Sequence, residues 1–522
     1  MSTRRVALLT SLVSLLQACG GGGSDPPPPP VPDPPPPPPP PAAGPPVWSG
    51  HAGDAQHRAR APAATQALAH IVWSTPIDLA PPYRSNGSLL IHYGSPVITG
   101  AGTVLLPVKT TSAGDFRVEA RLGASGALLW QQRSDYVLPT SSWTPSFNLA
   151  LAADNRLYVP ASGGRLLVRD NADSATGALR HIVFYGSGVY DGAAAALDAQ
   201  VQINTPLTVD GAGNVFFGFI AAPGNAAGLR SGFARVAADG SAVWAAAATL
   251  AADGAISKPA MNCAPALSND GARLYVAVNS DSTQSGCLLA LDSTTLAIQA
   301  RQVLRVPLGG LLARVSDSST SSPTVGPDGD VYYGVLDQNF SSHNGRGWLL
   351  HFDADLATVK TPGSFGWDDT PSIVPATMVP GYSGASSYLL LVKYNNYYGA
   401  GSGDGVNQMA IIDPQGTQAD RYAPAVTVMK DVLVVTGPTP DPGTVGGVRE
   451  WCVNTAAVDP ATGSVLVNNE DGRLYRWHLG SNTLSQSVRM NDGVGQAYTA
   501  TVVGPTGLVY AINNAQLHAV GA

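Results

Sequence analysis

Residues 205–217 read TPLTVDGAGNVFF. A small polar residue and a proline open the stretch, and a short run with alternating apolar positions follows, as in a half-buried strand. Asp210, Gly211, Gly213 and Asn214 then interrupt the run before an apolar–aromatic segment begins. Glycine and asparagine tolerate positive φ, so such residues between two apolar runs indicate a hairpin. The stretch therefore predicts two antiparallel strands joined by a tight turn.

The same pattern recurs along most of the chain. Regular copies occupy residues 94–106, 147–159, 205–217, 264–276 and 322–333, and more irregular copies occupy 370–392, 455–467 and 499–510. Each unit continues with a third strand, such as 288–292 or 349–353, and usually with a fourth, such as 125–130 or 239–244. Short four-stranded antiparallel units repeated many times are typical of a β-propeller. We expect an all-β chain with one propeller of about eight four-stranded blades. Seven blades is the alternative, because residues 363–453 are irregular.

The two ends of this repeated region complement each other. The last unit reaches Ala522 with only about three strands, whereas residues 71–77, IVWSTPI, read as a fourth strand without a blade. We expect the N-terminal strand to complete the C-terminal blade, because this closure leaves no open sheet edge.

Several blades end in a motif of the form Asp/Ala-x-x-Thr/Ser-Gly-x-x-x-Trp, and residues 48–54, WSGHAGD, fit the pattern W-x-x-x-x-G-D. In these motifs the chain resembles the quinoprotein-like (PQQ-repeat-like) propeller superfamily over nearly all of residues 48–522. The resemblance implies the fold and says little about function. Quinoprotein dehydrogenases share an adjacent Cys-Cys disulfide and a Glu/Asn/Asp calcium set, which cannot be placed here by motif. We therefore expect no cofactor.

The N-terminus has the order of a lipoprotein signal. Arg4 and Arg5 precede a short apolar run, which ends in Leu16-Gln17-Ala18-Cys19. The run is too short to span a bilayer. The final four residues resemble the bacterial lipobox, which implies cleavage after residue 18 and lipid on Cys19. Gly20 follows the cysteine, and by the sorting rule of lipoproteins this favours the outer membrane.

A Gly/Pro-rich segment separates this anchor from the repeats. Residues 19–47 form the expected linker, and residues 26–46 are almost all proline. Such a run adopts polyproline II and acts as a semi-rigid spacer. The predicted organisation is a signal peptide at 1–18, a linker at 19–47 and a propeller at 48–522. A ligand for a proline-recognising domain is the lesser alternative for the linker.

Charge and motifs exclude several functions. The net charge is −7, and no Lys/Arg cluster occurs outside the extreme N-terminus, so nucleic-acid binding is not expected. The sequence has no nucleophile elbow, zinc-protease motif or P-loop. The histidines are scattered, and the acidic turns lack the full set of calcium ligands, so no metal site is predicted.

Export would permit a disulfide among the remaining cysteines. Cys263 and Cys287 start the first and third strands of one predicted blade, so this pair ranks first, and Cys452 is left unpaired. Direct bonding requires one of these strand ends to bend inward.

Two aromatic-rich stretches, 394–405 and 340–348, are interpreted as long inter-strand loops, where binding residues often lie. The predicted ligand-contact residues are Tyr394, Tyr397, Tyr398, His343 and Trp348. Long glycine-rich connections without a ligand are the alternative interpretation.

Together these features favour a binding or scaffold protein anchored in the outer membrane through Cys19, facing the periplasm or the cell surface. Its expected partner is a protein or a glycan. The functional analogy is the propeller lipoprotein of the outer-membrane barrel-assembly machinery, at the level of the fold alone. The alternative is an enzyme with a site in the axial channel: a quinoprotein-like oxidoreductase, a hydrolase or a lyase. Titratable groups converging on the axis would favour that enzyme.

Overall fold

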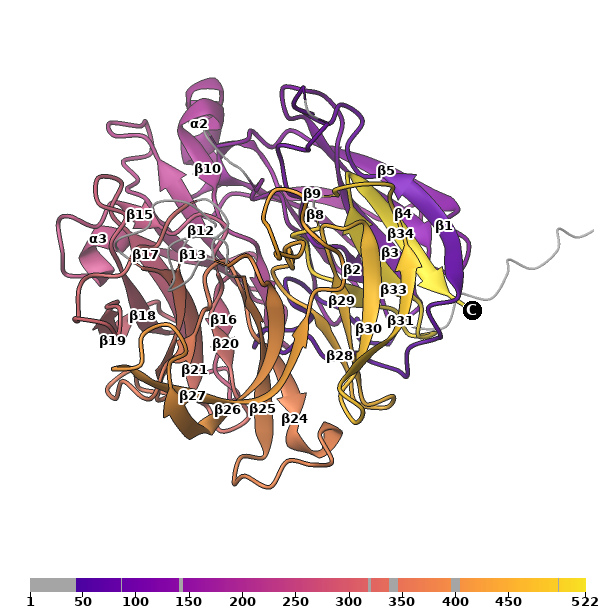
Figure 1. Ribbon diagram of the computed structural model, residues 1–522. Helices are drawn as coiled ribbons and strands as arrows, with labels where there is room; N and C mark the ends of the chain where they lie inside the picture. Colours follow the sequence, from indigo (N-terminus) through magenta and orange to yellow (C-terminus); the bar gives the residue numbers. More distant parts are fainter. Residues whose placement is uncertain are drawn as a thin grey trace, which may run out of the picture. The chain divides into compact units, whose positions relative to one another are not determined.

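A computed structural model describes residues 44–85, 87–139, 144–317, 321–337, 346–395, 404–495 and 497–522. Cys19, the signal peptide and most of the linker lie outside the described residues. One compact unit spans Ala43–Ala522. It contains eight antiparallel sheets that follow one another along the chain (Figure 1). The predicted eight-bladed propeller is therefore confirmed, and the seven-bladed alternative is wrong.

Blades 1 to 4 take their strands in chain order, from the inner strand outward. Blade 1 contains β2 (Val97–Ile98), β3 (Thr103–Lys109), β4 (Phe116–Leu122) and β5 (Leu128–Ser134), and blade 2 contains β6 (Ala150–Leu151), β7 (Leu157–Pro160), β8 (Leu166–Arg169) and β9 (Leu179–Ile182). Blade 3 contains β10 (Val201–Ile203), β11 (Thr208–Val209), β12 (Val215–Ala221), β13 (Gly232–Val236) and β14 (Ala242–Ala246), and blade 4 contains β15 (Lys258–Pro259), β16 (Ala266–Leu267), β17 (Arg273–Asn279), β18 (Gly286–Asp292) and β19 (Ile298–Val303).

Blades 5 to 7 follow the same order, and blade 8 adds a strand from the N-terminal region. Blade 5 contains β20 (Thr324–Val325), β21 (Val331–Leu336), β22 (Gly347–Phe352) and β23 (Gly363–Ser364), and blade 6 contains β24 (Ser372–Pro375), β25 (Tyr388–Tyr394), β26 (Gln408–Ala419) and β27 (Thr427–Thr436). Blade 7 contains β28 (Ala457–Asp459), β29 (Ser464–Asn468), β30 (Arg473–His478) and β31 (Thr483–Arg489), and blade 8 contains β32 (Val502–Val503), β33 (Val509–Asn513), β34 (Gln516–Gly521) and β1 (His70–Pro76).

The pairing of β1 with β34 closes the ring. These antiparallel strands place Ile71 opposite Val520 and Thr75 opposite Leu517, and in Figure 1 the indigo β1 lies beside the yellow β34. The predicted closure by an N-terminal strand is confirmed. Blade 8 thereby becomes a four-stranded sheet like the other blades.

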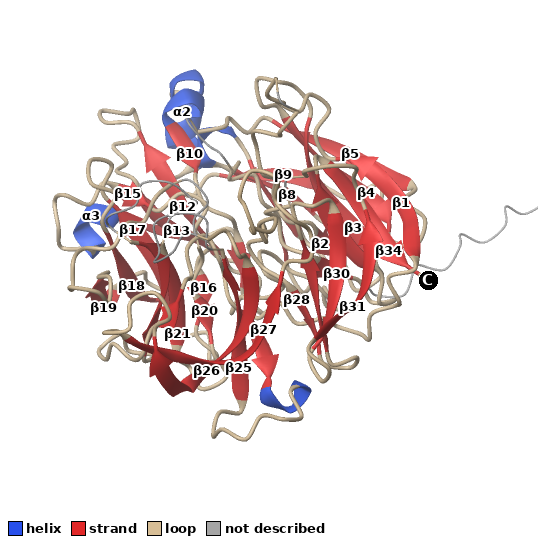
Figure 2. Cartoon of the chain, viewed as in Figure 1, coloured by secondary structure: helices blue, strands red, loops and turns tan. Residues whose placement is uncertain are grey.

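In the described part of the chain, helical structure is confined to short segments between strands (Figure 2). They are η1 (Ser162–Gly164), α1 (Ser187–Asp191), α2 (Ala194–Gln200), α3 (Ala247–Leu250) and η2 (Ala376–Met378).

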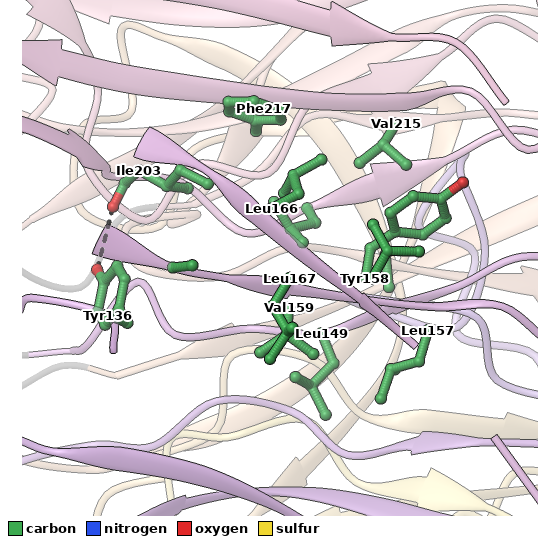
Figure 3. Close-up of a cluster of buried hydrophobic side chains, with 14 of the residues drawn as sticks. Tyr136, Leu149, Leu157, Tyr158, Val159, Leu166, Leu167, Ile203, Val215 and Phe217 are labelled. Carbon is green, nitrogen blue, oxygen red and sulfur yellow. Dashed lines mark hydrogen bonds between the residues drawn. The ribbon is translucent and has the colours of Figure 1, made fainter. Parts of the chain in front are cut away.

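The core consists of the faces that neighbouring blades press together. Second strands such as β3 are buried at every position, whereas the outer strand β31 alternates exposed and half-buried positions. A strand with blades on both sides has no solvent face, so its sequence is a continuous apolar run. Figure 3 shows one such cluster, in which Val159 and Phe217 pack between blades and the Tyr136 hydroxyl donates to the Ile203 carbonyl at 3.0 Å.

The irregular stretch of the sequence corresponds to a ribbon that leaves blade 6. Strands β26 and β27 form a long hairpin with register shifts near Asp413. Val426 and Val428 pack in a cluster made mainly by blades 4 and 5, and Met429 N–H donates to the Pro362 carbonyl beside the short β23. The ribbon thus supplies outer cover to blade 5, whose own fourth strand is short.

Candidate functional site

The two ends of the propeller differ in what covers the axis. Tight turns from inner to second strands lie at one end, together with residues 47–66, which we call the belt. The opposite end carries the long connections between blades and the loops between second and third strands, and we call it the loop end.

The belt runs around the axis and bonds to successive blades. Its backbone carbonyls accept from the inner strands of consecutive blades, for example Ser49 O from Leu151 N at 2.8 Å and Ala59 O from Val458 N at 2.8 Å. The full order of contacts is blade 1 through Trp48, blade 2 through Ser49, blade 4 through Ala55, blade 5 through Gln56, blade 6 through Arg58, blade 7 through Ala59 and blade 8 through Gln66. The belt therefore closes the axis at this end.

Short polar side chains line the axis and join the blades. Ser95 N donates to Asn148 Oδ1 at 2.9 Å, and Thr370 Oγ1 donates to Asn454 Oδ1 at 2.9 Å. Thr499 Oγ1 donates to the Tyr93 carbonyl at 2.6 Å and so links blade 8 to blade 1. Polar residues before the inner strands thus tie blade 1 to blade 2, blade 6 to blade 7 and blade 8 to blade 1.

A small cavity lies on the axis between the belt and the loop end. Its volume is about 30 Å³, and neutral polar and aromatic side chains make most of its wall. The lining residues are His51, Tyr93, Ser95, Thr144, Asn148, Pro206, Asn262, Asn454, Tyr498, Thr499 and Ala500. We call it the axial cavity.

A buried charge cluster adjoins this cavity at the loop end. Lys393, in strand β25, is buried, and its Nζ lies 2.6 Å from Asp368 Oδ1. The neighbouring Asp369 accepts from the Lys393 backbone N–H at 3.2 Å. Lys393 Nζ also lies 5.6 Å from the ring centre of Tyr498, which lines the axial cavity. Residues from blades 6 and 8 thus meet beside the axis.

Two glutamates extend the charge cluster toward blade 7. Glu450 is buried and accepts from Asn395 Nδ2 at 2.9 Å. Glu470 is buried too, and its Oε1 accepts from the Glu450 backbone N–H at 3.3 Å and lies 3.8 Å from Arg449 Nη1. We define the charge cluster as Asp368, Asp369, Lys393, Glu450 and Glu470.

Burial shifts the protonation of these acids. It raises the pKa of Asp368 to about 7 against the opposing effect of Lys393. Burial also raises the pKa of Glu470 to about 8, and the Glu450 carboxylate adds to the shift. Burial opposes the charge of Lys393, but the surrounding carboxylates outweigh it and hold the pKa of Lys393 above its usual value. Asp368 and Glu470 therefore titrate near neutral pH, as acid–base groups of functional sites do.

A second buried Lys–Asp pair lies on the other side of the cavity. Lys109, the last residue of β3, has its Nζ 3.0 Å from Asp78 Oδ1. The hydroxyl of Tyr93 donates to Asp78 Oδ2 at 2.7 Å. The two tyrosines of the axial cavity, Tyr93 and Tyr498, are thus each placed beside a buried lysine pair.

The loop residues predicted from the sequence have other positions. Trp348 lies within β22, is buried, and donates from Nε1 to Asp337 Oδ2 at 3.0 Å. Tyr394 ends β25, is buried, and donates to Asp431 Oδ1 at 2.8 Å. These two are core residues of strands and not loop residues, because their rings fill the space between sheets. Tyr397, Tyr398 and His343 lie outside the described residues.

The predicted Cys263–Cys287 disulfide is not formed. Cys263, Cys287 and Cys452 are buried, and none of them is disulfide-bonded. Cys263 packs with Tyr275 and Tyr333 in one cluster, whereas Cys287 packs with Leu274 and Phe216 in another. These clusters lie on opposite faces of the blade 4 sheet, because successive strand residues point to opposite sides.

No direct signal in the sequence marks the charge cluster. Its members come from blades 6 and 7, and the distance along the chain from Asp368 to Glu470 hides their proximity. One usable sign was Lys393, which interrupts the apolar run YLLLVKY of a buried strand. A lysine at such a position is almost never buried without a partner.

The described residues do not fit the quinone of the dehydrogenases that the chain resembles. The axial cavity is about 30 Å³, whereas pockets for cofactor-sized ligands measure about 300–1,000 Å³. Within the described ranges, no three His, Cys, Asp or Glu side chains are grouped so that they could hold a metal ion. We therefore derive no chemistry through a quinone.

Among the described residues, no helix has the length and apolar character needed to cross a bilayer.

Comparison with known proteins gives the fold. No family model matches the chain, and no curated protein matches it in sequence. Among solved structures, it is similar to the quinohemoprotein alcohol dehydrogenase of Comamonas testosteroni, with a TM-score of 0.54 and 14% identity over 89% of this chain and 76% of that one. It is also similar to a europium-containing methanol dehydrogenase, with a TM-score of 0.55 and 11% identity over 89% of this chain and 88% of that one. At these identities the likeness shows the fold alone, and the chain has the β-propeller fold of these two dehydrogenases.

Proposed function

We propose that this chain is a lipid-anchored binding propeller of the outer membrane, which holds a protein or glycan partner at its loop end. The observation that carries the proposal is the difference between the two ends of the propeller. The belt closes one end of the axis, and Pro45 and Pro46, which continue the proline-rich linker, lie at that same end beside Asp210 and Asp270. The loop end is then the free face.

The loop end also has a feature suited to a partner. In a hairpin between β27 and β28 the Asp441 N–H donates to the Gly447 carbonyl at 3.0 Å, and the tip residue Val445 is fully exposed. Arg449, at the base of this hairpin, lies 3.3 Å from Asp441 and near Glu470 of the charge cluster. The apolar tip offers contact area to a partner, and the charged residues at the base of the hairpin offer specificity.

Site-specific photocrosslinking in cells that produce the full chain tests this polarity. A photoreactive amino acid is placed at Val445 and, as the matched control at the belt end, at exposed Asp270. We expect adducts of higher mass from position 445 alone, and digestion with protease or glycosidase then identifies the partner class. Adducts from position 270 alone, from both positions or from neither would contradict the proposal.

A second candidate function is acid–base catalysis at the same end of the axis. The charge cluster favours it, because burial places the pKa of Asp368 at about 7 and that of Glu470 at about 8. An enzyme would convert the partner molecule recovered by crosslinking, and mass spectrometry would detect the product. Turnover by the wild type, with loss of turnover in Glu470→Gln, would support catalysis. Stable binding without turnover would contradict catalysis and support binding as the function.

A further inference from the structure

Two polar atoms inside the axial cavity have no hydrogen-bond partner in the described part of the chain. They are Nε2 of His51, which belongs to the belt, and Nδ2 of Asn262, which precedes the inner strand of blade 4. His51 as a whole is half-buried but its Nε2 atom is buried, and Asn262 is 6% exposed. A buried polar atom left without a partner costs about 1–3 kcal/mol, so an empty cavity would be unfavourable.

The size of the cavity limits what can occupy it. One water molecule needs at least about 10–15 Å³ of such volume, and the cavity offers about 30 Å³. Two water-sized groups fit, and a sugar ring or an aromatic ligand does not.

The wall also limits the charge of the occupant. Among the described residues, no carboxylate, lysine or arginine lines the cavity, and its polar groups are amides, hydroxyls and the His51 ring. Burial holds the pKa of His51 well below its usual value, so this ring is neutral. An ion without a partner in a buried site costs far more than it gains, so a neutral occupant that both donates and accepts is required.

We propose that the axial cavity binds about two water molecules, which bridge the belt to the inner strands through His51 Nε2 and Asn262 Nδ2. The belt then contacts blade 4 in two ways: directly, where the Leu267 N–H donates to the Ala55 carbonyl at 2.7 Å, and through water at His51. The lining of the water site comes from the belt and from blades 1, 2, 3, 4, 7 and 8. It is thus an internal binding site distinct from the loop-end partner site.

Crystals of the propeller within the full mature chain test the occupant directly. We expect two ordered water peaks within hydrogen-bond distance of His51 Nε2 and Asn262 Nδ2. A crystal pressurised with xenon should show no xenon there, because xenon enters dry apolar cavities. Xenon in the cavity, an empty cavity or an anomalous bromide peak after a bromide soak would each overturn the proposal.

A double-mutant cycle tests the bridge in solution. His51→Phe and Asn262→Leu should be non-additive: the double variant should change the unfolding equilibrium constant about threefold less than the product of the single changes. The matched control pairs Asn262→Leu with His57→Phe, another belt histidine, which contacts the Pro323 carbonyl of blade 5 instead; this pair should be additive. Additivity in the first cycle would overturn the bridge. If a variant fails to fold, the water signal of the wild-type protein in magnetic relaxation dispersion decides the question, and absence of long-lived water overturns it.

Discussion

Lys393 neutralises part of a buried acidic site, so its removal should be costly. Lys393→Met leaves Asp368 and Asp369 buried with no cation in contact. Removing one partner of a buried ion pair costs about 3–5 kcal/mol. We expect a loss of that size in the free energy of unfolding measured by urea denaturation. The double variant Lys393→Met/Asp368→Asn should recover part of the loss, and a Lys393→Met protein within 1 kcal/mol of the wild type would contradict the ion pair.

His57 gives the stability of the folded chain a defined pH dependence. Burial lowers the pKa of His57 to about 4, whereas the unfolded chain titrates near 6.5. Between these values the unfolded state binds more protons, so the stability contributed by neutral His57 is complete above pH 6.5 and falls as the pH decreases toward 4. The raised pKa values of Asp368 and Glu470 act in the opposite sense, so the effect of His57 has to be isolated by comparison with a variant.

His57→Gln removes this titration and supplies the comparison. We expect the stability advantage of the wild type over His57→Gln to shrink by about 1.4 kcal/mol for each pH unit below 6.5. Denaturant unfolding at pH 7, 6 and 5 measures the difference. Parallel stability profiles for the two proteins would show that His57 is not buried in the neutral form.

At the scale of elements, Trp48 fixes the start of the belt. Its side chain is fully buried and the belt begins its bonds to the blades here. Trp48→Ala leaves a large cavity, which costs about 3–5 kcal/mol for an aromatic side chain. We expect that loss in thermal and urea unfolding. The matched control is Trp244→Ala on the outer strand β14, where the ring is 36% exposed, and a similar loss in both variants would argue against a special role of the belt.

The ribbon of β26 and β27 depends on one buried ion pair. Arg346 Nη2 lies 2.7 Å from Asp420 Oδ2, both side chains are buried, and the guanidinium lies over the Trp348 ring. Asp420→Ala leaves Arg346 without its partner, so residues 417–429 should exchange amide hydrogens faster by mass spectrometry. The control Arg421→Ala removes an exposed charge 3.9 Å from Asp431, and such surface pairs contribute at most about 1 kcal/mol. Equal exchange in both variants would contradict the assignment.

The strands were predictable and the belt was not, for a physical reason. Segments such as 205–217 carry periodic apolar residues and glycine turns, which report local backbone structure directly. The belt has no such period: it bonds to each blade through single contacts, and Ala52, His57 and Ala59 adopt positive φ, which alanine and histidine seldom do. Residues 48–54 therefore resembled a family motif without revealing that they close the axis.

For the whole molecule, the sequence predicted the ring and its closure but not the site. The number of blades follows from counting the repeats. The pairing of β1 with β34 follows because the C-terminal repeat lacks a fourth strand and the N-terminal region contains an additional one. The charge cluster depends on how the adjacent blades 6 and 7 bring their loop-end residues together and on how deeply Lys393 and Glu470 are buried. Pairwise proximity of this kind leaves no periodic trace in one sequence.

Anchoring is the property of the whole chain on which the proposed polarity depends. The lipid proposed on Cys19 would supply membrane affinity of about 0.8 kcal/mol for each buried methylene group. Cys19→Ala should therefore move the protein from the membrane pellet to the soluble fraction and remove the acyl mass from its N-terminal peptide. The matched control is Cys287→Ala, which alters a buried residue of blade 4 and should leave the protein in the pellet. If Cys19→Ala remains in the membrane fraction after washing with high salt, the protein is held by some other contact, and the loop end need not be the free face.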